Sequence, residues 1–172
     1  MANNHEIKIK TYSPEQTEQV GEAIGNWLEV GDVLTLDGDL GAGKTCLTRG
    51  IARGAKFAGR VTSPTFTIVN EYVGGRIKLF HFDTYRLEGV DDFYASGLDE
   101  YFDDDGASII EWSSIIEEAL PADAFRAGIF GVGDERELKI ELPSSANKHI
   151  LARFEKLSAT LSELSFGAGG DL

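Results

Sequence analysis

Cysteine, basic residues and long apolar runs are all scarce in this sequence of 172 residues. Its single cysteine, Cys46, excludes a scaffold held together by disulfide bonds. No apolar run approaches the roughly 18 residues that a membrane-spanning helix requires. The start, Met-Ala-Asn-Asn-His, has neither the basic nor the apolar region of a secretory signal. We therefore expect a cytoplasmic protein that does not work at a membrane.

Basic side chains are outnumbered, with 16 Lys and Arg against 29 Asp and Glu, which gives a formal net charge of −13. The deficit lies in residues 88–118, which contain 11 acidic residues and no Lys or Arg. Because an acidic domain repels phosphate backbones at long range, we do not expect this chain by itself to bind nucleic acid tightly. Two interpretations of the segment stay open: an acidic face for a basic partner, or a solvated helix and loop.

The apolar pattern predicts one three-layer α/β domain with a mixed central sheet flanked by helices, over residues 1–166, and a flexible tail over 167–172. Strands are expected around 7–9, 33–36, 66–73, 76–82, 107–110, 125–132 and 138–142. Helices are expected from Pro14 to before Gly31, from beyond residue 46 to Gly54 or Gly59, over 113–120, and over 150–164. Ser13 is the predicted N-cap of the first helix, with Gln16 completing a capping box.

One motif carries chemistry: Gly38-Asp39-Leu40-Gly41-Ala42-Gly43-Lys44-Thr45 fits G-x-x-x-x-G-K-[ST], directly after a predicted strand and before a predicted helix. In such a P-loop the backbone N–H groups surround a β-phosphate, the lysine reaches the β- and γ-phosphates, and the threonine hydroxyl coordinates Mg²⁺. A chance match is expected in about one chain in a hundred of this composition. The sequence therefore predicts a P-loop NTPase.

Hydrolysis also needs an acid beside the metal and a group that orients water. Three acids follow predicted strands: Asp37, Asp83 and Glu111. We interpret Asp37 as an exposed acid beside the loop, whereas the other two can approach the phosphate crevice at the carboxyl ends of the strands. In Ser63-Pro64-Thr65-Phe66, Thr65 either senses a γ-phosphate, as switch-loop hydroxyls do, or belongs to a plain turn before a hairpin.

Four segments together resemble the bacterial TsaE (YjeE) family: the P-loop, VTSPTF at 61–66, HFDTYRL at 81–87 and IEW at 110–112, in this order and spacing. The resemblance covers about residues 6–142. Four motifs together are far more specific than the P-loop by itself. One departure is Cys46, which stands where the family commonly has a second threonine and which we expect to pack as a small buried helix residue.

The resemblance implies the small ATPase of the tRNA threonylcarbamoyladenosine pathway. Family members bind ATP and Mg²⁺ and hydrolyse ATP slowly on their own. They join the TsaB–TsaD pair, in which TsaD transfers the threonylcarbamoyl group to the adenosine beside the anticodon of certain tRNAs. ATP binding and hydrolysis would reset that complex between turnovers, and this chain would meet tRNA only through its partners.

Roles follow by motif from the same resemblance. Thr45 and Glu111 are the expected Mg²⁺ residues, and either Asp83 or Glu111 orients the water. The expected catalytic residues are Lys44, Thr65, Asp83 and Glu111. The expected nucleotide contacts are Ser13, Asp39, Leu40, Gly41, Ala42, Gly43, Lys44, Thr45, Cys46, Trp112 and Arg136.

Two other functions stay open from the residues themselves. A small-molecule kinase usually carries arginines on a mobile lid, and segment 88–118, which could form a lid, has none. A non-hydrolysing scaffold would use ATP only to fix its shape. His81 alternates with Phe80 and Phe82, which favours a hydrogen-bonded or exposed strand histidine over a metal ligand, and no Cys/His cluster has zinc spacing.

Overall fold

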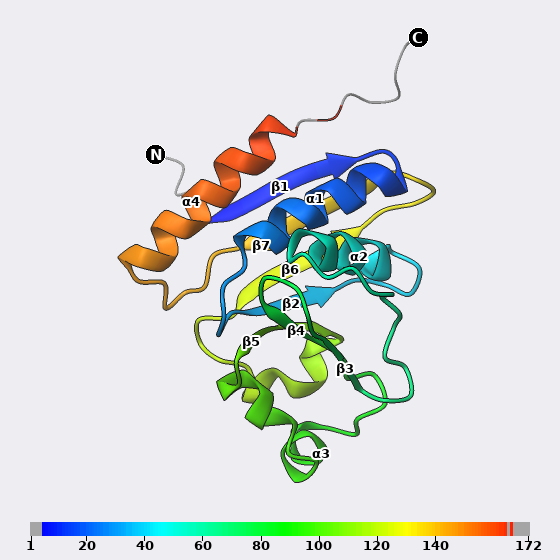
Figure 1. Ribbon diagram of the computed structural model, residues 1–172, viewed down its shortest axis with the longest axis vertical. Helices are drawn as coiled ribbons and strands as arrows, with labels where there is room; N and C mark the ends of the chain where they lie inside the picture. The colour runs from blue at the N-terminus through cyan, green and yellow to red at the C-terminus, as the bar shows by residue number, and fades with distance from the viewer. Residues whose placement is uncertain (1–4, 165, 167–172) are drawn as a thin grey trace.

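The structure is a computed structural model that describes residues 5–164 and 166 (Figure 1). Its strands are β1 (Glu6–Thr11), β2 (Val33–Asp37), β3 (Val69–Tyr72), β4 (Lys78–Asp83), β5 (Gly106–Glu111), β6 (Phe125–Phe130) and β7 (Arg136–Glu141). Its helices are α1 (Pro14–Trp27), α2 (Lys44–Gly54), α3 (Val90–Ala95) and α4 (Lys148–Glu163), with 3₁₀ helices η1 (Leu98–Asp103) and η2 (Ser113–Ala119). The predicted tail at 167–172 lies outside the described residues.

All seven strands form one mixed sheet in the order β1-β7-β6-β2-β5-β4-β3. β6, β2, β5 and β4 run parallel, and the flanking strands β7, β1 and β3 are antiparallel to their neighbours. The parallel strands therefore end at one edge of the sheet, where β2 leads into the loop before α2. In doubly wound folds this carboxyl edge is where ligands bind.

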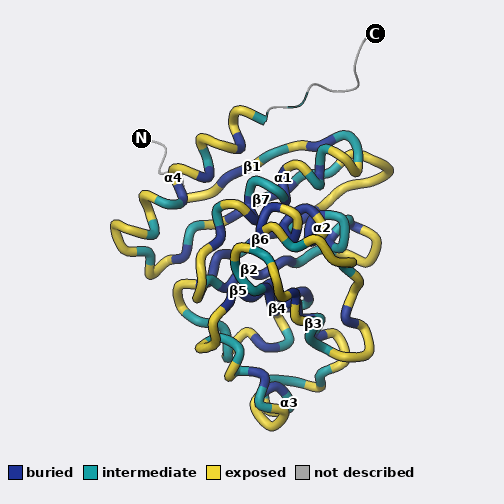
Figure 2. The backbone as a smooth tube through the Cα atoms, viewed as in Figure 1, coloured by how far each residue is buried: buried dark blue, intermediate teal, exposed yellow. Residues whose placement is uncertain are grey.

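Two hydrophobic clusters lie on opposite faces of the sheet. The larger joins α1, α2 and α4 to one face, and the smaller joins α3, η1 and η2 to the other. Figure 2 shows the buried backbone concentrated in the central strands and the inner sides of the helices. The predicted three-layer α/β fold is confirmed over β2, β5 and β4. On the other face of β6 and β7 lies an open depression lined by Arg126, Phe130 and Lys139.

The predicted helix start at Pro14 is confirmed, since the Ser13 hydroxyl accepts a hydrogen bond from the Gln16 N–H at 3.2 Å.

The first hairpin starts later than predicted. Residues 65–67 form a turn, and the next residue, Ile68, has φ of +68°, so β3 begins at Val69. Among residues 5–164 and 166, no helix has both the length and the apolar character needed to cross a membrane.

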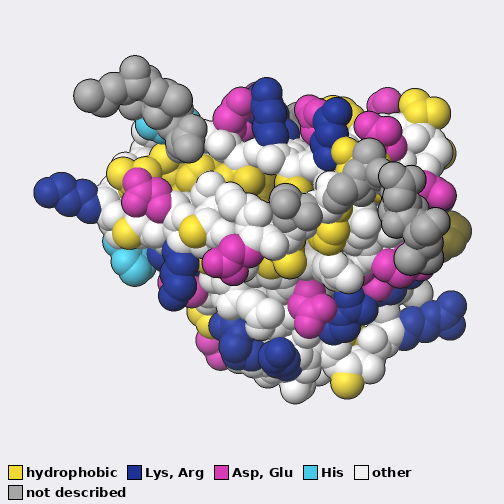
Figure 3. Space-filling view, turned by 90° about the horizontal axis from the view of Figure 1, so that it is seen from above, with side chains coloured by type: hydrophobic (Ala, Val, Ile, Leu, Met, Phe, Trp, Pro, Cys, Tyr) yellow, Lys and Arg dark blue, Asp and Glu magenta, His cyan; other side chains and the backbone are white. Residues whose placement is uncertain are grey.

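The acidic segment 88–118 forms α3, η1, β5 and η2, at the end of the molecule away from α4 and β1 (Figure 1). Asp103, Asp104 and Asp105 are exposed there. On the face that carries α4 and β1, acidic and basic side chains are interspersed (Figure 3), and pairs such as Lys139 with Glu6 lie within 3.2 Å. The negative charge is thus concentrated at one end of the protein.

Helices α1 and α2 approach each other backbone to backbone. A methyl group on Gly25 would lie 2.0 Å from the Ile51 carbonyl oxygen, and one on Gly50 would lie 2.1 Å from that of Glu18. Real side chains do not tolerate such distances, so only glycine fits at this crossing. Gly21 and Gly54 make similar close approaches. Because α2 begins at the P-loop, this crossing fixes where the loop lies.

Replacing Gly25 by alanine should lower the free energy of unfolding by at least about 2 kcal/mol, because the added methyl group forces the helices apart. This loss would outweigh the gain of about 1 kcal/mol that alanine gives within a helix. Urea unfolding measures the effect, with Gln19→Ala on the exposed side of α1 as the control. A Gly25→Ala protein as stable as the control would contradict the close approach.

Candidate functional site

The P-loop lies between the end of β2 and the start of α2. Gly41 and Gly43 have φ of +80° and +101°, a region that side chains rarely adopt. Gly43 is the N-cap of α2, and it makes no side-chain capping bond. The first N–H groups of the helix therefore keep their capacity to bind an anion, and the helix dipole adds partial positive charge there.

The Lys44 ammonium is buried inside this loop. Lys44 is only 7% exposed, and its Nζ donates to the carbonyl oxygens of Gly38 and Asp39, the latter at 3.4 Å. Nζ also lies 4.3 Å from the centre of the Trp112 ring. None of the ion pairs among the described residues includes Lys44. A buried charge without a counter-charge is costly, so the site is electrostatically prepared for an anion.

Arg136, at the start of β7, holds the same loop from another side. Its guanidinium donates to the carbonyl oxygen of Ala42 at 2.6 Å and to that of Gly41 at 3.3 Å. It also donates to the carbonyl oxygens of Gly133 and Glu135 in its own hairpin. The predicted nucleotide contact Arg136 is thus next to the P-loop, and in this structure its hydrogen bonds go to the backbone.

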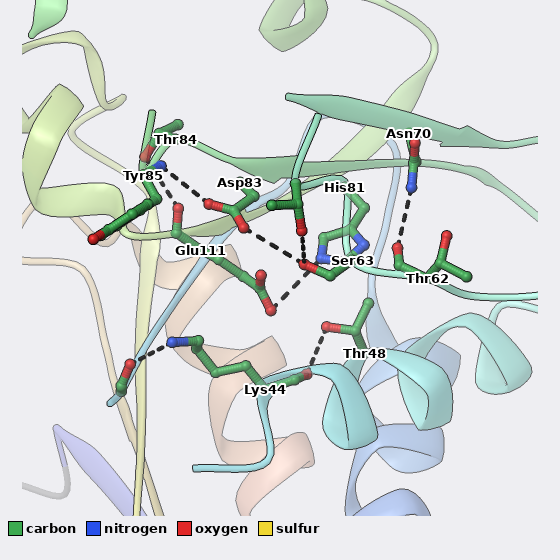
Figure 4. A network of polar contacts seen from close by, with 12 residues as sticks. Lys44, Thr48, Thr62, Ser63, Asn70, His81, Asp83, Thr84, Tyr85 and Glu111 are labelled. Carbon is green, nitrogen blue, oxygen red and sulfur yellow. Dashed lines mark hydrogen bonds and ion pairs between the residues drawn. The ribbon is translucent and has the colours of Figure 1, made fainter. Parts of the chain in front are cut away.

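The two predicted acids lie side by side. Asp83 and Glu111 are paired residues at the ends of the parallel strands β4 and β5, which places their backbones about 4.8 Å apart. Figure 4 shows Glu111 between Lys44 on one side and Asp83 and His81 on the other. Glu111 is buried, and its Oε1 has no hydrogen-bond partner within the described part of the chain. The sheet therefore brings Lys44, Asp83 and Glu111 to one point.

Side chains at the ends of β4 and β2 form hydrogen bonds with the turn after β5. Trp112 has φ of +59°, a strained conformation for a tryptophan. The Thr84 hydroxyl is within hydrogen-bonding distance of the carbonyl oxygens of Glu111 and Trp112. Asp37 accepts from the Ser113 N–H at 2.9 Å and from its hydroxyl at 2.6 Å. The interpretation of Asp37 as merely an exposed acid was wrong, because it is half-buried and holds this turn.

The loop before β3 faces the acids. The Ser63 hydroxyl lies 3.5 Å from Oδ2 of Asp83, and the Thr65 hydroxyl lies 3.5 Å from that of Ser63. Both distances are at the long limit for hydrogen bonds. Thr65 is exposed and does not touch Glu111, so among the predicted catalytic residues it is the one held most loosely.

Comparison with known proteins identifies the family. The family model described as "Threonylcarbamoyl adenosine biosynthesis protein TsaE" matches residues 11–142, which is more than half of the chain. The chain belongs to the TsaE family. A TsaE protein of Bacillus subtilis is 41% identical over 157 residues, covering 91% of this chain and 94% of that protein. One of Haemophilus influenzae is 38% identical over 123 residues, covering 71% and 77%.

The crystal structure of YdiB from Bacillus subtilis matches with a TM-score of 0.75 and 36% identity, covering 90% of this chain and 95% of that one. Both curated relatives are named "tRNA threonylcarbamoyladenosine biosynthesis protein TsaE". The predicted family and the predicted fold class are confirmed.

Two further residues that the TsaE resemblance predicts to contact the nucleotide, Ser13 and Cys46, lie where α1 meets α2. The Cys46 thiol donates to the carbonyl oxygen of Pro14 at 3.3 Å, which brings the start of α1 against the first turn of α2. We expected Cys46 to be buried, but it is only half-buried. Leu40, by contrast, is 90% exposed.

The lone thiol of this TsaE chain should react slowly. Burial raises the pKa of Cys46, and the nearby Glu18 carboxylate raises it further. Since only the thiolate is nucleophilic, alkylation by iodoacetamide at pH 8 should be at least about threefold slower in the folded protein than in urea. Loss of free thiol over time measures both rates. Equal rates in the two states would contradict the partial burial of Cys46.

Proposed function

We propose that this TsaE-family chain binds ATP and hydrolyses it with Mg²⁺, within the biosynthesis of threonylcarbamoyladenosine in tRNA. The observation that carries the proposal is the buried Lys44 ammonium, which has no carboxylate partner among the described residues and lies inside a P-loop with open N–H groups. The β- and γ-phosphates of a nucleotide supply the missing negative charge. Adenine is favoured over guanine by the family resemblance.

The donor set of the chain fits Mg²⁺. Within the described ranges, no group of three or more His, Cys, Asp and Glu side chains could hold a metal ion. Mg²⁺ does not require one, because it commonly uses one or two protein oxygens together with phosphates and water. Thr45 and Glu111 would hold it, and Oε1 of Glu111 is buried with no hydrogen-bond partner among residues 5–164 and 166. When bound, Mg²⁺ neutralises charge on the phosphates and favours attack on the γ-phosphorus.

The chain's own residues then have distinct tasks. Lys44 binds the phosphates and Trp112 covers the lysine. Asp83 is the proposed water-orienting residue. Its Oδ1 accepts a hydrogen bond from the Tyr85 N–H at 3.0 Å, whereas the one contact of Oδ2 within the described part of the chain is the Ser63 hydroxyl at 3.5 Å. That second oxygen is free to accept a proton or a hydrogen bond from water.

We place this chain with the TsaB–TsaD pair in the cytoplasm. The family names and the four motifs support this assignment, and so does the acidic segment 88–118, which disfavours direct binding of RNA. The partners would hold the tRNA, and this subunit would supply the nucleotide-dependent step.

Lys44 and Glu111 variants separate binding from turnover. Lys44→Ala should abolish ATP binding, because the loop loses its only buried cation. Glu111→Gln should bind ATP and lose steady-state hydrolysis by about 100-fold or more, as expected when a metal-side group is removed. Titration calorimetry measures binding and phosphate release measures turnover. Unchanged turnover in Glu111→Gln would contradict the role of Glu111.

Single-turnover hydrolysis with and without the TsaB–TsaD pair tests the role in the complex. We expect the partners to accelerate turnover of the wild-type chain and to leave Glu111→Gln inactive. If the partners never change the turnover rate, ATP serves only to fix the shape of the subunit, and the proposed ATP-driven cycle is wrong.

A further inference from the structure

His81 is a buried polar side chain that the proposed reaction does not yet use. It lies on β4 two residues before Asp83, and its side chain is fully buried. Its Nδ1 lies 2.9 Å from the Tyr72 hydroxyl, whereas its Nε2 has no hydrogen-bond partner among the described residues. A buried imidazole with one orphaned nitrogen is uncommon, because unpaired buried polar atoms cost free energy.

The orphaned nitrogen faces an orphaned oxygen. Nε2 of His81 lies 3.7 Å from Oε1 of Glu111, and both side chains are almost completely buried (Figure 4). This distance is too long for a hydrogen bond but within range for electrostatic contact. Catalytic hydrogen bonds are often long in the unliganded state and shorten when the ligands are present.

The neighbours of the ring determine which nitrogen carries the proton. The Tyr72 hydroxyl lies 3.2 Å from the Thr62 carbonyl oxygen, which also accepts from the Asn70 amide at 3.0 Å. A carbonyl oxygen accepts two hydrogen bonds, so these contacts permit Tyr72 to donate either to Thr62 or to Nδ1 of His81. Donation to Nδ1 puts the ring proton on Nε2, where it faces the Glu111 carboxylate. The opposite tautomer would place the Nε2 lone pair against a buried carboxylate oxygen, which is repulsive.

We infer that His81 is a positioning residue for Glu111: its Nε2–H orients the carboxylate that would bind Mg²⁺, and Tyr72 fixes the tautomer. The inference rests on the proposed function. Residues that hydrogen-bond to a metal ligand hold that ligand in place, and their loss typically costs about 10–100-fold in metal affinity or activity.

The same contacts connect Glu111 to the loop before β3. Tyr72 and Asn70 both lie within hydrogen-bonding distance of Thr62, the residue immediately before Ser63-Pro64-Thr65. A path of polar contacts therefore runs from the backbone of this loop through Tyr72 and His81 to Glu111. The position of the loop and the orientation of the metal-side carboxylate are thus linked through one imidazole.

A matched pair of variants tests the positioning role. Glutamine carries its amide nitrogen near the place of Nε2, and asparagine near that of Nδ1. In His81→Asn we expect Mn²⁺ to bind the nucleotide complex at least about 10-fold more weakly, as read by electron paramagnetic resonance. Nucleotide binding without metal should be unchanged, and His81→Gln should recover most of the metal affinity. His149→Asn, on an exposed part of α4, is the control.

Nitrogen NMR on the wild-type protein tests the tautomer of His81 directly. This measurement does not depend on whether a variant folds. The sequence has only three histidines, His5, His81 and His149. Long-range ¹H–¹⁵N spectra of the metal-free protein should show the Nε2–H form for the buried ring. Tyr72→Phe should weaken this preference, because only the Glu111 carboxylate then favours it, while the variant keeps the aromatic ring that stacks on Phe57. A wild-type His81 in the Nδ1–H form would overturn the inference.

The outcomes separate this inference from the proposed function. If the wild-type chain neither binds nor hydrolyses ATP with Mg²⁺, the proposed function fails. If Glu111→Gln loses metal binding but His81→Asn and His81→Gln both retain it, the proposed function stands and the positioning role of His81 is wrong.

Discussion

The rest of the site depends on a buried lysine ammonium that has no carboxylate partner in the described part of the chain. Lys44 is held by the carbonyl oxygens of its own loop and by the face of Trp112. These neutral groups stabilise the cation less than an anion would. Oε1 of Glu111, which has no hydrogen-bond partner among the described residues, lies at the same edge of the sheet. The site therefore holds a cation that needs an anion and a carboxylate that needs a cation, and the proposed magnesium nucleotide would satisfy both.

The fold holds these groups rigidly. The glycines of α1 and α2 allow the two helices to meet at backbone distance, which fixes the helix that begins at Lys44. The pairing of β4 with β5 places Asp83 beside Glu111. Thr84 and Asp37 hold the turn that contains Trp112 from the two strands beside β5. Packing away from the P-loop thus determines the geometry of the candidate site.

Local signals in the sequence predicted much of this arrangement. The N-cap at Ser13, the P-loop and the acids after strands each depend on residues close together in the chain, so their pattern is visible without a structure. The contacts of Asp37 with Ser113 and of Tyr72 with His81 were not predictable in that way, because they depend on strand order and register. The close crossing of α1 and α2 at Gly25 and Gly50 was not predicted either, because it depends on how two helices meet in space.

A crystal structure of this chain with Mg²⁺ and a non-hydrolysable ATP analogue tests the central claim most directly. The account predicts that the Lys44 ammonium leaves the carbonyl oxygens of Gly38 and Asp39 and binds the phosphates, with Thr45 and Glu111 at the metal. A nucleotide bound elsewhere, with Lys44 still on those two carbonyl oxygens, would contradict it.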